Sequence, residues 1–312
     1  MRERIGKVWL EDRLDDAMAG REPDPTEKRL TEIVSLVPEA EYAARLAEQP
    51  SWPLMKQLSP LRENLMNWIP LRPGQRVLEL GAECGPVTGA FLGKGAEVIS
   101  VEASRVRCRI NAMRHREVDG LTVLAADPEE ALSSFPESFD FVAWPSAPEA
   151  ASAGAPETGP EDDCLPHWLR LIRQVLKPDG TLFLAMENPL GLKYFAGRPE
   201  ESTGRLFESI EGFPSGTGVR TYSRQELIRT AEEAGYEWEF YYPYPDHWFP
   251  EKIYSDACLP REGELTRNWQ NFDADRVILF DESKAFDTVL RAGLFPEFSN
   301  SFLAELRKEG QA

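Results

Sequence analysis

The sequence predicts an α/β fold built on a doubly wound, mostly parallel sheet of seven strands. Three observations lead to this prediction. Strands alternate with helices from residue 75 onward, the strands are largely apolar, and a glycine-rich turn follows the first of them. Such alternation is typical of a parallel sheet covered by helices on both faces. The expected strands span residues 76–80, 97–102, 121–125, 139–143, 181–186, 236–242 and 275–281.

Helices are expected between these strands. They lie near residues 87–93, 104–116, 128–133, 165–176 and 223–234. No clear helix separates the last two strands, which suits a hairpin in which one strand runs antiparallel. Residues 145–163 and 188–220 interrupt the alternation with many glycines and prolines. We interpret both segments as insertions, because long loops inside a compact domain are often functional.

Two terminal extensions are expected around a central domain of residues 71–282. Residues 1–70 are predicted to be an N-terminal helical extension or lid, with one helix over 28–37 and another that opens at Ser59 and Pro60. Residues 283–312 are predicted to be a C-terminal extension. They contain a short helix near Phe286 and a second amphipathic segment, which could cover the sheet edge or form an oligomer contact.

Composition limits the classes of function. The chain has 312 residues, of which 42% are hydrophobic, and a formal net charge of −18. Such an acidic surface argues against long nucleic acids as partners. No apolar run is long enough to span a membrane, and the N-terminus lacks the apolar core of a signal peptide. The four cysteines form no CxxC pair. We therefore expect a cytoplasmic protein with reduced thiols and no metal.

A nucleotide site is predicted where the first strand of the domain ends. The strand over 76–80 runs into the turn 81–85 (GAECG), and a helix follows. This order places backbone N–H groups and a positive helix end beside a ligand. Gly81 and Gly85 suit a sharp turn on which a ligand lies. Glu102 ends the second strand, where it could accept both hydroxyls of a ribose.

The same arrangement could bind NAD, but three features favour S-adenosylmethionine (SAM). Glu79 lies just before the glycine turn, and Asp127 follows the third strand, where an acid can accept the adenine amino group. The turn also lacks the third glycine of the dinucleotide fingerprint. The pattern therefore favours SAM over a dinucleotide.

Residues 75–281 resemble the class I SAM-dependent methyltransferases, a family with a Rossmann-like sheet of seven strands and a reversed hairpin at one edge. A narrower resemblance joins four motifs. They are residues 58–64 (LSPLREN), 187–197 (ENPLGLKYFAG), 241–246 (YYPYPD) and 298–303 (FSNSFL). Together these resemble bacterial methyltransferases associated with surface-polysaccharide and glycan gene clusters.

The resemblance implies a set of cofactor-binding positions. These are Glu79, Gly81, Ala82, Glu83, Gly85, Glu102, Asp127 and Trp144. Glu83 departs from the family pattern, because methyltransferases commonly have glycine at this position. Its side chain would point toward the methionine end of the cofactor. There it could accept a hydrogen bond from the ammonium group, or it could crowd the site and repel the carboxylate.

Methyl transfer to an ordinary hydroxyl requires a base, because the hydroxyl pKa lies far above 7. The candidate catalytic residues are Glu187, Asp246 and His247. Glu187 follows a strand beside the expected methyl group, although it could also bind a substrate hydroxyl or cap a turn. Asp246 could be a turn acid, and His247 an ordinary loop residue.

The leading hypothesis is a SAM-dependent methyltransferase, a transferase that methylates a hydroxyl of a sugar or glycan intermediate in polysaccharide biosynthesis. Aromatic residues in the loops suit a sugar, although such residues also simply anchor loops. One alternative is a methyltransferase-fold protein that has lost catalysis and serves as a partner or scaffold, which Glu83 motivates. Another is a small-molecule methyltransferase of secondary metabolism. A homo-oligomer or a pathway-enzyme partner is compatible with each hypothesis.

Overall fold

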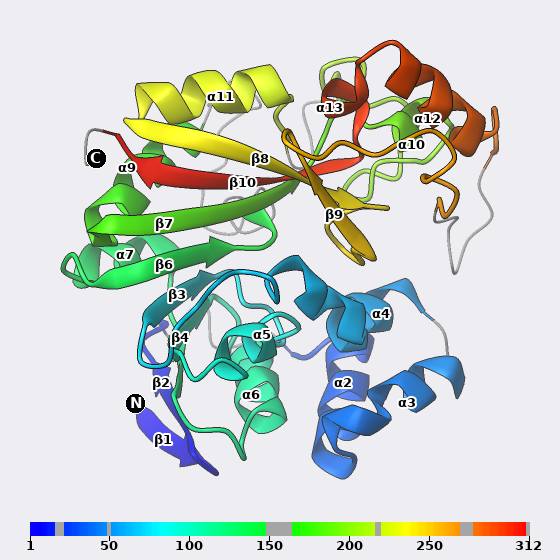
Figure 1. The fold of residues 1–312 in the computed structure, drawn as a ribbon. Coiled ribbons are helices and arrows are strands. Elements are labelled where there is room, and N and C mark those ends of the chain that lie inside the picture. Colours follow the sequence, from blue (N-terminus) through cyan, green and yellow to red (C-terminus); the bar gives the residue numbers. More distant parts are fainter. Residues whose placement is uncertain (16–21, 49–50, 148–163, 216–219, 269–276, 310–312) are drawn as a thin grey trace. The chain divides into compact units, whose positions relative to one another are not determined.

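The computed structural model describes residues 1–15, 22–48, 51–147, 164–215, 220–268 and 277–309 (Figure 1). The chain divides into two compact units. Unit 1 comprises Met1–Pro145 and Leu171–Leu182, and unit 2 comprises Ser146–Arg170 and Phe183–Ala312. Most of the expected insertion at 145–163 lies outside the described residues. The division into 1–70, 71–282 and 283–312 stays a prediction.

Unit 1 opens with a hairpin and short helices, and strands then alternate with helices. Its elements are β1 (Arg2–Ile5), β2 (Val8–Asp12), α2 (Pro25–Leu36), η1 (Glu39–Glu41), α3 (Tyr42–Glu48), α4 (Trp52–Leu58), η2 (Pro60–Leu65), β3 (Arg76–Leu80), α5 (Thr88–Leu92), β4 (Glu97–Glu102), α6 (Arg105–Arg114), β5 (Leu121–Ala125), α7 (Pro128–Ser134) and β6 (Phe139–Trp144). Helix α6 packs against β2 and β5, and α5 packs against β4.

Unit 2 contains the remaining elements. They are α9 (Leu165–Val175) and β7 (Leu176–Glu187), each of which belongs partly to unit 1, then α10 (Leu192–Phe195), α11 (Arg224–Glu233), β8 (Tyr236–Tyr244), β9 (Lys252–Ser255), α12 (Glu282–Arg291), α13 (Phe295–Phe298) and β10 (Ser301–Lys308). A capping box of Ser223 and Glu226 starts α11, which packs against β8.

The strands are hydrogen-bonded in the order β1-β2-β5-β4-β3-β6-β7-β10-β8-β9. The pairs β3–β4, β3–β6, β4–β5 and β2–β5 are parallel, whereas β1–β2, β8–β10 and β8–β9 are antiparallel. Six of the seven expected strands are confirmed as β3 to β8. Within the described residues the sheet nevertheless has ten strands, so the prediction of a seven-stranded sheet is wrong.

The N-terminal segment is not helical throughout, because its first residues form the hairpin β1–β2. Gly6 has a φ of +59° and makes the turn. Val8 and Leu10 are buried on one face of β2, while Trp9 is exposed on the other. This period-two burial is that of a strand with one covered face. β2 then extends the parallel part of the sheet by pairing with β5.

The helices that follow β2 share a core with the glycine turn. A capping box of Asp24 and Glu27 starts α2, with Pro25 as its first residue. Ser59 caps η2, a 3₁₀ helix that ends at Leu65 and replaces the longer helix expected here. The buried members of this core are Leu30, Ile33, Val34, Val37, Tyr42, Leu54, Leu58, Cys84 and Ile110. The N-terminal helices are therefore packed onto Cys84 of the turn.

The expected strand at 275–281 is absent from residues 277–281, and residues 275 and 276 lie outside the described ones. The side chains of Val277, Ile278 and Leu279 are more than half exposed. Instead, β10 pairs with β8 in the antiparallel direction. The sequence predicts only an amphipathic segment here. In β10 six consecutive residues are buried, as in a strand covered on both faces.

Candidate functional site

The glycine turn of unit 1 joins β3 to α5 and lies against α6. Gly81 has a φ of +61° and Gly85 a φ of +78°, a region of backbone conformation that favours glycine. A Cβ atom on Gly85 would lie 2.2 Å from Oδ1 of Asn111, a buried residue of α6. Packing against α6 therefore requires glycine at position 85, whether or not a ligand lies on the turn.

Glu79 precedes this turn and is fully buried. The hydroxyls of Thr88 and Ser100 donate to its Oε2 atom, both at 2.6 Å. Its Oε1 atom has no hydrogen-bond partner among the described residues. Burial raises the pKa of Glu79 to about 7, against the lowering effect of the two hydroxyl hydrogen bonds. The carboxyl group thus links β3 to β4 and α5, and its predicted contact with a cofactor stays a prediction.

Glu102 and Asp127 lie at the carboxyl ends of β4 and β5, whose residues Glu102 and Ala125 are register partners. Oε2 of Glu102 accepts the backbone N–H of Glu83 at 3.1 Å, and Oε1 accepts that of Ser104 at 3.1 Å. Burial raises the pKa of Glu102. Asp127 caps α7 by accepting two backbone N–H groups. Glu102 is therefore fixed beside the glycine turn, and Asp127 is fixed at the neighbouring strand end.

The backbone of Glu83 has an unusual conformation. Its φ is +48°, which is rare for a residue other than glycine. Nε2 of Gln57 donates to Glu83 Oε2 at 3.1 Å, and Nη2 of Arg62 lies 3.6 Å from the same atom. Gln57 also accepts the N–H of Cys84 at 3.2 Å. The Glu83 carboxylate is therefore held by the N-terminal helices, and Arg62 offsets its charge.

The two remaining predicted cofactor residues are buried. Ala82 donates its N–H to the carbonyl of Val101 at 3.1 Å, which ties the turn to β4. Trp144 is the last residue of β6, the neighbour of β3 in the sheet. No described residues form a group of three or more His, Cys, Asp or Glu that could hold a metal ion. Nor does any helix in the described ranges have the length and apolarity to cross a membrane.

These residues fit a nucleotide-like cofactor. Two carboxylates lie at adjacent strand ends, that of Glu102 beside the glycine turn, so they can accept hydrogens from hydroxyl and amino groups. Oε1 of Glu79, buried just before the turn, is a further acceptor without a partner among the described residues. The negative charge of Glu83 is already offset by Arg62, which lessens repulsion of an anionic group.

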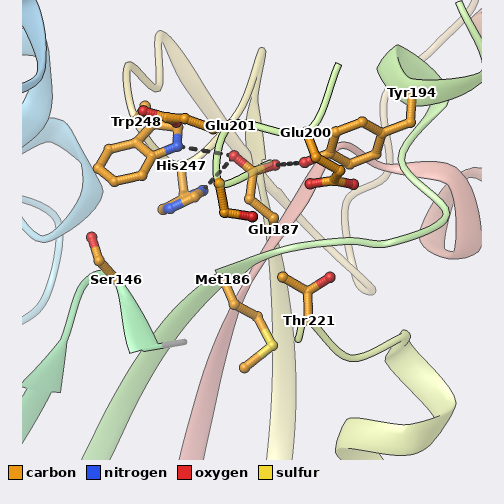
Figure 2. A pocket seen from close by; sticks show the side chains of 10 residues that line it. Ser146, Met186, Glu187, Tyr194, Glu200, Glu201, Thr221, His247 and Trp248 are labelled. Atoms are coloured by element: carbon orange, nitrogen blue, oxygen red, sulfur yellow. Dashed lines mark hydrogen bonds and ion pairs between the residues drawn. The ribbon is translucent and has the colours of Figure 1, made fainter. Parts of the chain in front are cut away.

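A pocket in unit 2 gathers the predicted catalytic residue Glu187 with His247 (Figure 2). Oε2 of Glu187 accepts a hydrogen bond from Nζ of Lys193 and another from the hydroxyl of Tyr194 at 3.1 Å. Oε1 accepts one from Nε1 of Trp248 at 2.9 Å. This carboxylate therefore ties the end of β7 to helix α10 and to the loop that follows β8.

Asp246 lies in the same network rather than in the lining of the pocket. It accepts the backbone N–H groups of Trp248 and Phe249, and it lies 3.8 Å from Nζ of Lys193 and 3.7 Å from Nη1 of Arg198. Nδ1 of buried His247 lies 3.9 Å from Oε1 of Glu187. The structure thus brings all three predicted catalytic residues together, although their roles stay predictions.

Sequence reasoning missed other polar residues of this pocket. Ser146, Glu200 and Thr221 line it and are buried. They come from three separate segments, and none belongs to a recognisable motif. Lys193 was missed as well, although its ammonium group pairs with both Glu187 and buried Asp246 and so offsets the repulsion between the two carboxylates. A lysine six residues after Glu187 was the one signal in the sequence that could have indicated this pair.

No protein-family model matches the sequence, and no curated protein matches it significantly. Solved structures do resemble the fold. Geranyl diphosphate methyltransferase, solved with GPP and sinefungin, is 17% identical, with a TM-score of 0.50 over 93% of this chain and 97% of that one. A chain from the complex between the Haloferax volcanii Trm112 methyltransferase activator and a methyltransferase is 18% identical, with a TM-score of 0.49 over 88% and 99%.

A SAM-dependent methyltransferase from Archaeoglobus fulgidus is 15% identical, with a TM-score of 0.46 over 90% of this chain and 99% of that one. Only the first of the three similarities reaches a TM-score of 0.50. It establishes that this chain has the Rossmann-like α/β fold of methyltransferases. At such low identity it establishes the fold alone, because one fold hosts many functions.

Proposed function

We propose that this protein is a SAM-dependent methyltransferase whose cofactor site is the glycine turn with Glu102 and Asp127. One observation carries the proposal: two fixed carboxylates lie at neighbouring strand ends in a methyltransferase fold, and one of them, Glu102, contacts the glycine turn. Glu102 would accept the ribose hydroxyls, and Asp127 the adenine amino group. Bound SAM would supply an electrophilic methyl group on a sulfonium.

The pocket of unit 2 supports the finer proposal that the acceptor is a hydroxyl of a sugar or glycan intermediate. Trp248 and Tyr194 line it, and sugars stack their C–H faces on such rings. The carboxylate of Glu187 already accepts hydrogen bonds from Lys193 and Trp248, and that of Asp246 pairs with Arg198. Both carboxylates therefore stabilise the pocket. His247 would take the proton of the acceptor hydroxyl. Nearby Glu187 would stabilise the imidazolium that forms.

Calorimetric titration with S-adenosylhomocysteine tests the cofactor site before any acceptor is known. The whole chain should bind it, and Glu102→Gln should weaken binding about 10- to 100-fold, because a charge-assisted hydrogen bond is lost. Glu97→Gln is the matched control, since Glu97 is the exposed first residue of the same strand. No binding of SAM or S-adenosylhomocysteine at millimolar ligand would overturn the proposal.

Glu83 favours a second candidate, a methyltransferase-fold protein that serves as a partner or scaffold. A side chain within the glycine turn could crowd the methionine end of the cofactor. The variant Glu83→Gly separates the two functions, because it removes the side chain and suits the positive φ. Tight SAM binding by the variant alone would support the scaffold. Binding by the unaltered chain would support the enzyme, with Arg62 and Gln57 holding Glu83 aside.

A further inference from the structure

The pocket in unit 2 contains three buried polar atoms that no protein group satisfies. Within the part of the chain that the structure describes, Oγ of Ser146, Oγ1 of Thr221 and Oε1 of Glu200 have no hydrogen-bond partner. Each of the three side chains belongs to a residue at most 8% exposed. A buried polar group without a hydrogen-bond partner is destabilising, and folded proteins contain few of them. Three around one pocket indicate that something else satisfies them.

The three atoms come from different parts of unit 2. Ser146 follows β6, Glu200 lies in the loop after α10, and Thr221 precedes α11. Figure 2 shows them arranged around Met186 and Glu187, at the end of β7. The pocket has a volume of about 40 Å³. A cavity needs about 10–15 Å³ on the same measure to hold one water molecule, so this space has room for a small polar group such as a hydroxymethyl or aminomethyl group.

The charges around the pocket are negative in sum. The two buried cations are already engaged, since Lys193 pairs with Glu187 and Arg198 with Asp246. The carboxyl group of Glu200 is additional, and this residue lines the pocket. Burial raises the pKa of Glu200, and the nearby charge of Glu187 raises it further, against the lowering effects of hydrogen bonds from Ser209 and Tyr194 and of the Lys193 charge. An anionic group such as a phosphate would therefore be repelled here.

We propose that this pocket receives the small polar end of the methyl acceptor, a hydroxyl- or ammonium-bearing carbon without phosphate. Glu200 accepts a hydrogen from this group, and the hydroxyls of Ser146 and Thr221 complete its hydrogen bonds. This inference rests on the proposed methyltransferase function, and it narrows the acceptor class. Sugars that carry phosphate at the reacting end are excluded, whereas neutral sugars and amino sugars are accepted.

Saturation-transfer NMR on the full chain with S-adenosylhomocysteine tests this selectivity. The probes are glucose, galactose and mannose, each as the free sugar, the 2-amino sugar and the 6-phosphate. Free and amino sugars should show saturation transfer, and each 6-phosphate should bind at least about tenfold more weakly, because charge repulsion in a buried pocket is poorly screened. Equal or tighter binding of the phosphates would overturn the proposal.

Three variants separate a ligand role from a structural one. Ser146→Ala and Thr221→Val remove hydroxyls that have no described partner, so the urea midpoint of unfolding should not fall. Sugar binding should weaken about 3- to 10-fold in each. Glu200→Gln should weaken binding of amino sugars most, whereas Glu233→Gln, an exposed residue of α11, should change nothing. Unchanged sugar binding in all three variants would overturn the assignment.

The titration with S-adenosylhomocysteine on the same samples distinguishes the two possible failures. If the nucleoside binds and no sugar does, the pocket assignment is wrong and the proposed methyltransferase stands. If the nucleoside does not bind at millimolar concentration, the proposed methyltransferase is wrong, whatever the sugars do.

Discussion

The buried carboxyl group of Glu79 is one of the groups that make the stability of unit 1 depend on pH. Its pKa is about 7 in the folded protein and near 4.5 when exposed. The folded state therefore binds more protons than the unfolded state between these values. The stabilisation is fully present below about pH 4.5 and is lost as the pH rises through about 7.

The variant Glu79→Gln should remove this contribution, because the amide keeps the shape and an oxygen for Thr88 and Ser100 but does not ionise. We expect the variant to gain about 3 kcal/mol of unfolding free energy relative to the unaltered chain between about pH 4.5 and pH 8. Urea unfolding at both pH values measures the gain. His115, whose pKa burial lowers to about 4, contributes with the opposite sign in both proteins and cancels. If the unfolding free energies of the variant and the unaltered chain changed with pH in parallel, the expectation would be contradicted.

His247 is the residue on which catalysis should depend most. The variant His247→Gln should lower kcat about 100- to 10,000-fold, because the acceptor hydroxyl loses its base. The affinity for S-adenosylhomocysteine should not change, since Glu102 and Asp127 are untouched. His167 on α9 offers a control substitution, His167→Gln. Label transfer from SAM measures the rates, and equal rates in both variants would exclude His247 as the base.

Among the elements, the glycine turn and α6 fit together through Gly85. The variant Gly85→Ala should lose at least about 2 kcal/mol more stability than Gly74→Ala. Both positions have a φ near +80°, but a Cβ on Gly74 would meet nothing within 4 Å. The comparison therefore isolates the collision with Asn111. Thermal and urea unfolding measure the two losses, and equal losses would show that backbone conformation alone requires glycine at position 85.

Elements with a regular pattern could be predicted from the sequence. Strands β3 to β6 are short apolar runs between helices, and all four were found at their expected places. Strand β10 could not be told from a helix, because Phe302, Leu303 and Leu306 also fit helical spacing and a fully buried strand shows no alternation. The run Val277–Phe280 has strand-forming side chains but no strand to pair with. In both segments, the presence or absence of a neighbouring strand, and not the β-propensity of the residues, determined whether a strand formed.

The candidate site was predictable to a similar degree. Glu102 ends one strand that the pattern located, and Asp127 comes shortly after another. Their proximity could be predicted because neighbouring parallel strands end at the same edge of a sheet. Ser146, Glu200 and Thr221 lie in loops, and only the folded chain brings them to one pocket. The contact of Glu83 with Gln57 and Arg62 was equally hidden, because it depends on how the N-terminal helices pack on the turn.

For the whole molecule, the division into two units predicts which residues a bound nucleoside should protect from hydrogen exchange. All proposed cofactor residues belong to unit 1. At a ligand concentration about 100 times the Kd, S-adenosylhomocysteine should stabilise the state that binds it by about 2.7 kcal/mol. Hydrogen exchange should slow most in residues 81–85 and at the start of α7. Slowing confined to β8 and β9 would place the nucleoside elsewhere.

Strand β10 has a consequence for how the protein is made. It lies between β7 and β8 in the sheet, although it follows β8 in the chain by more than fifty residues. During synthesis, β7 and β8 leave the ribosome with open edges that only a later segment can close. Open strand edges invite pairing with other chains. We therefore expect nascent chains that end before Ser301 to depend on chaperones and to be cleaved readily by proteases.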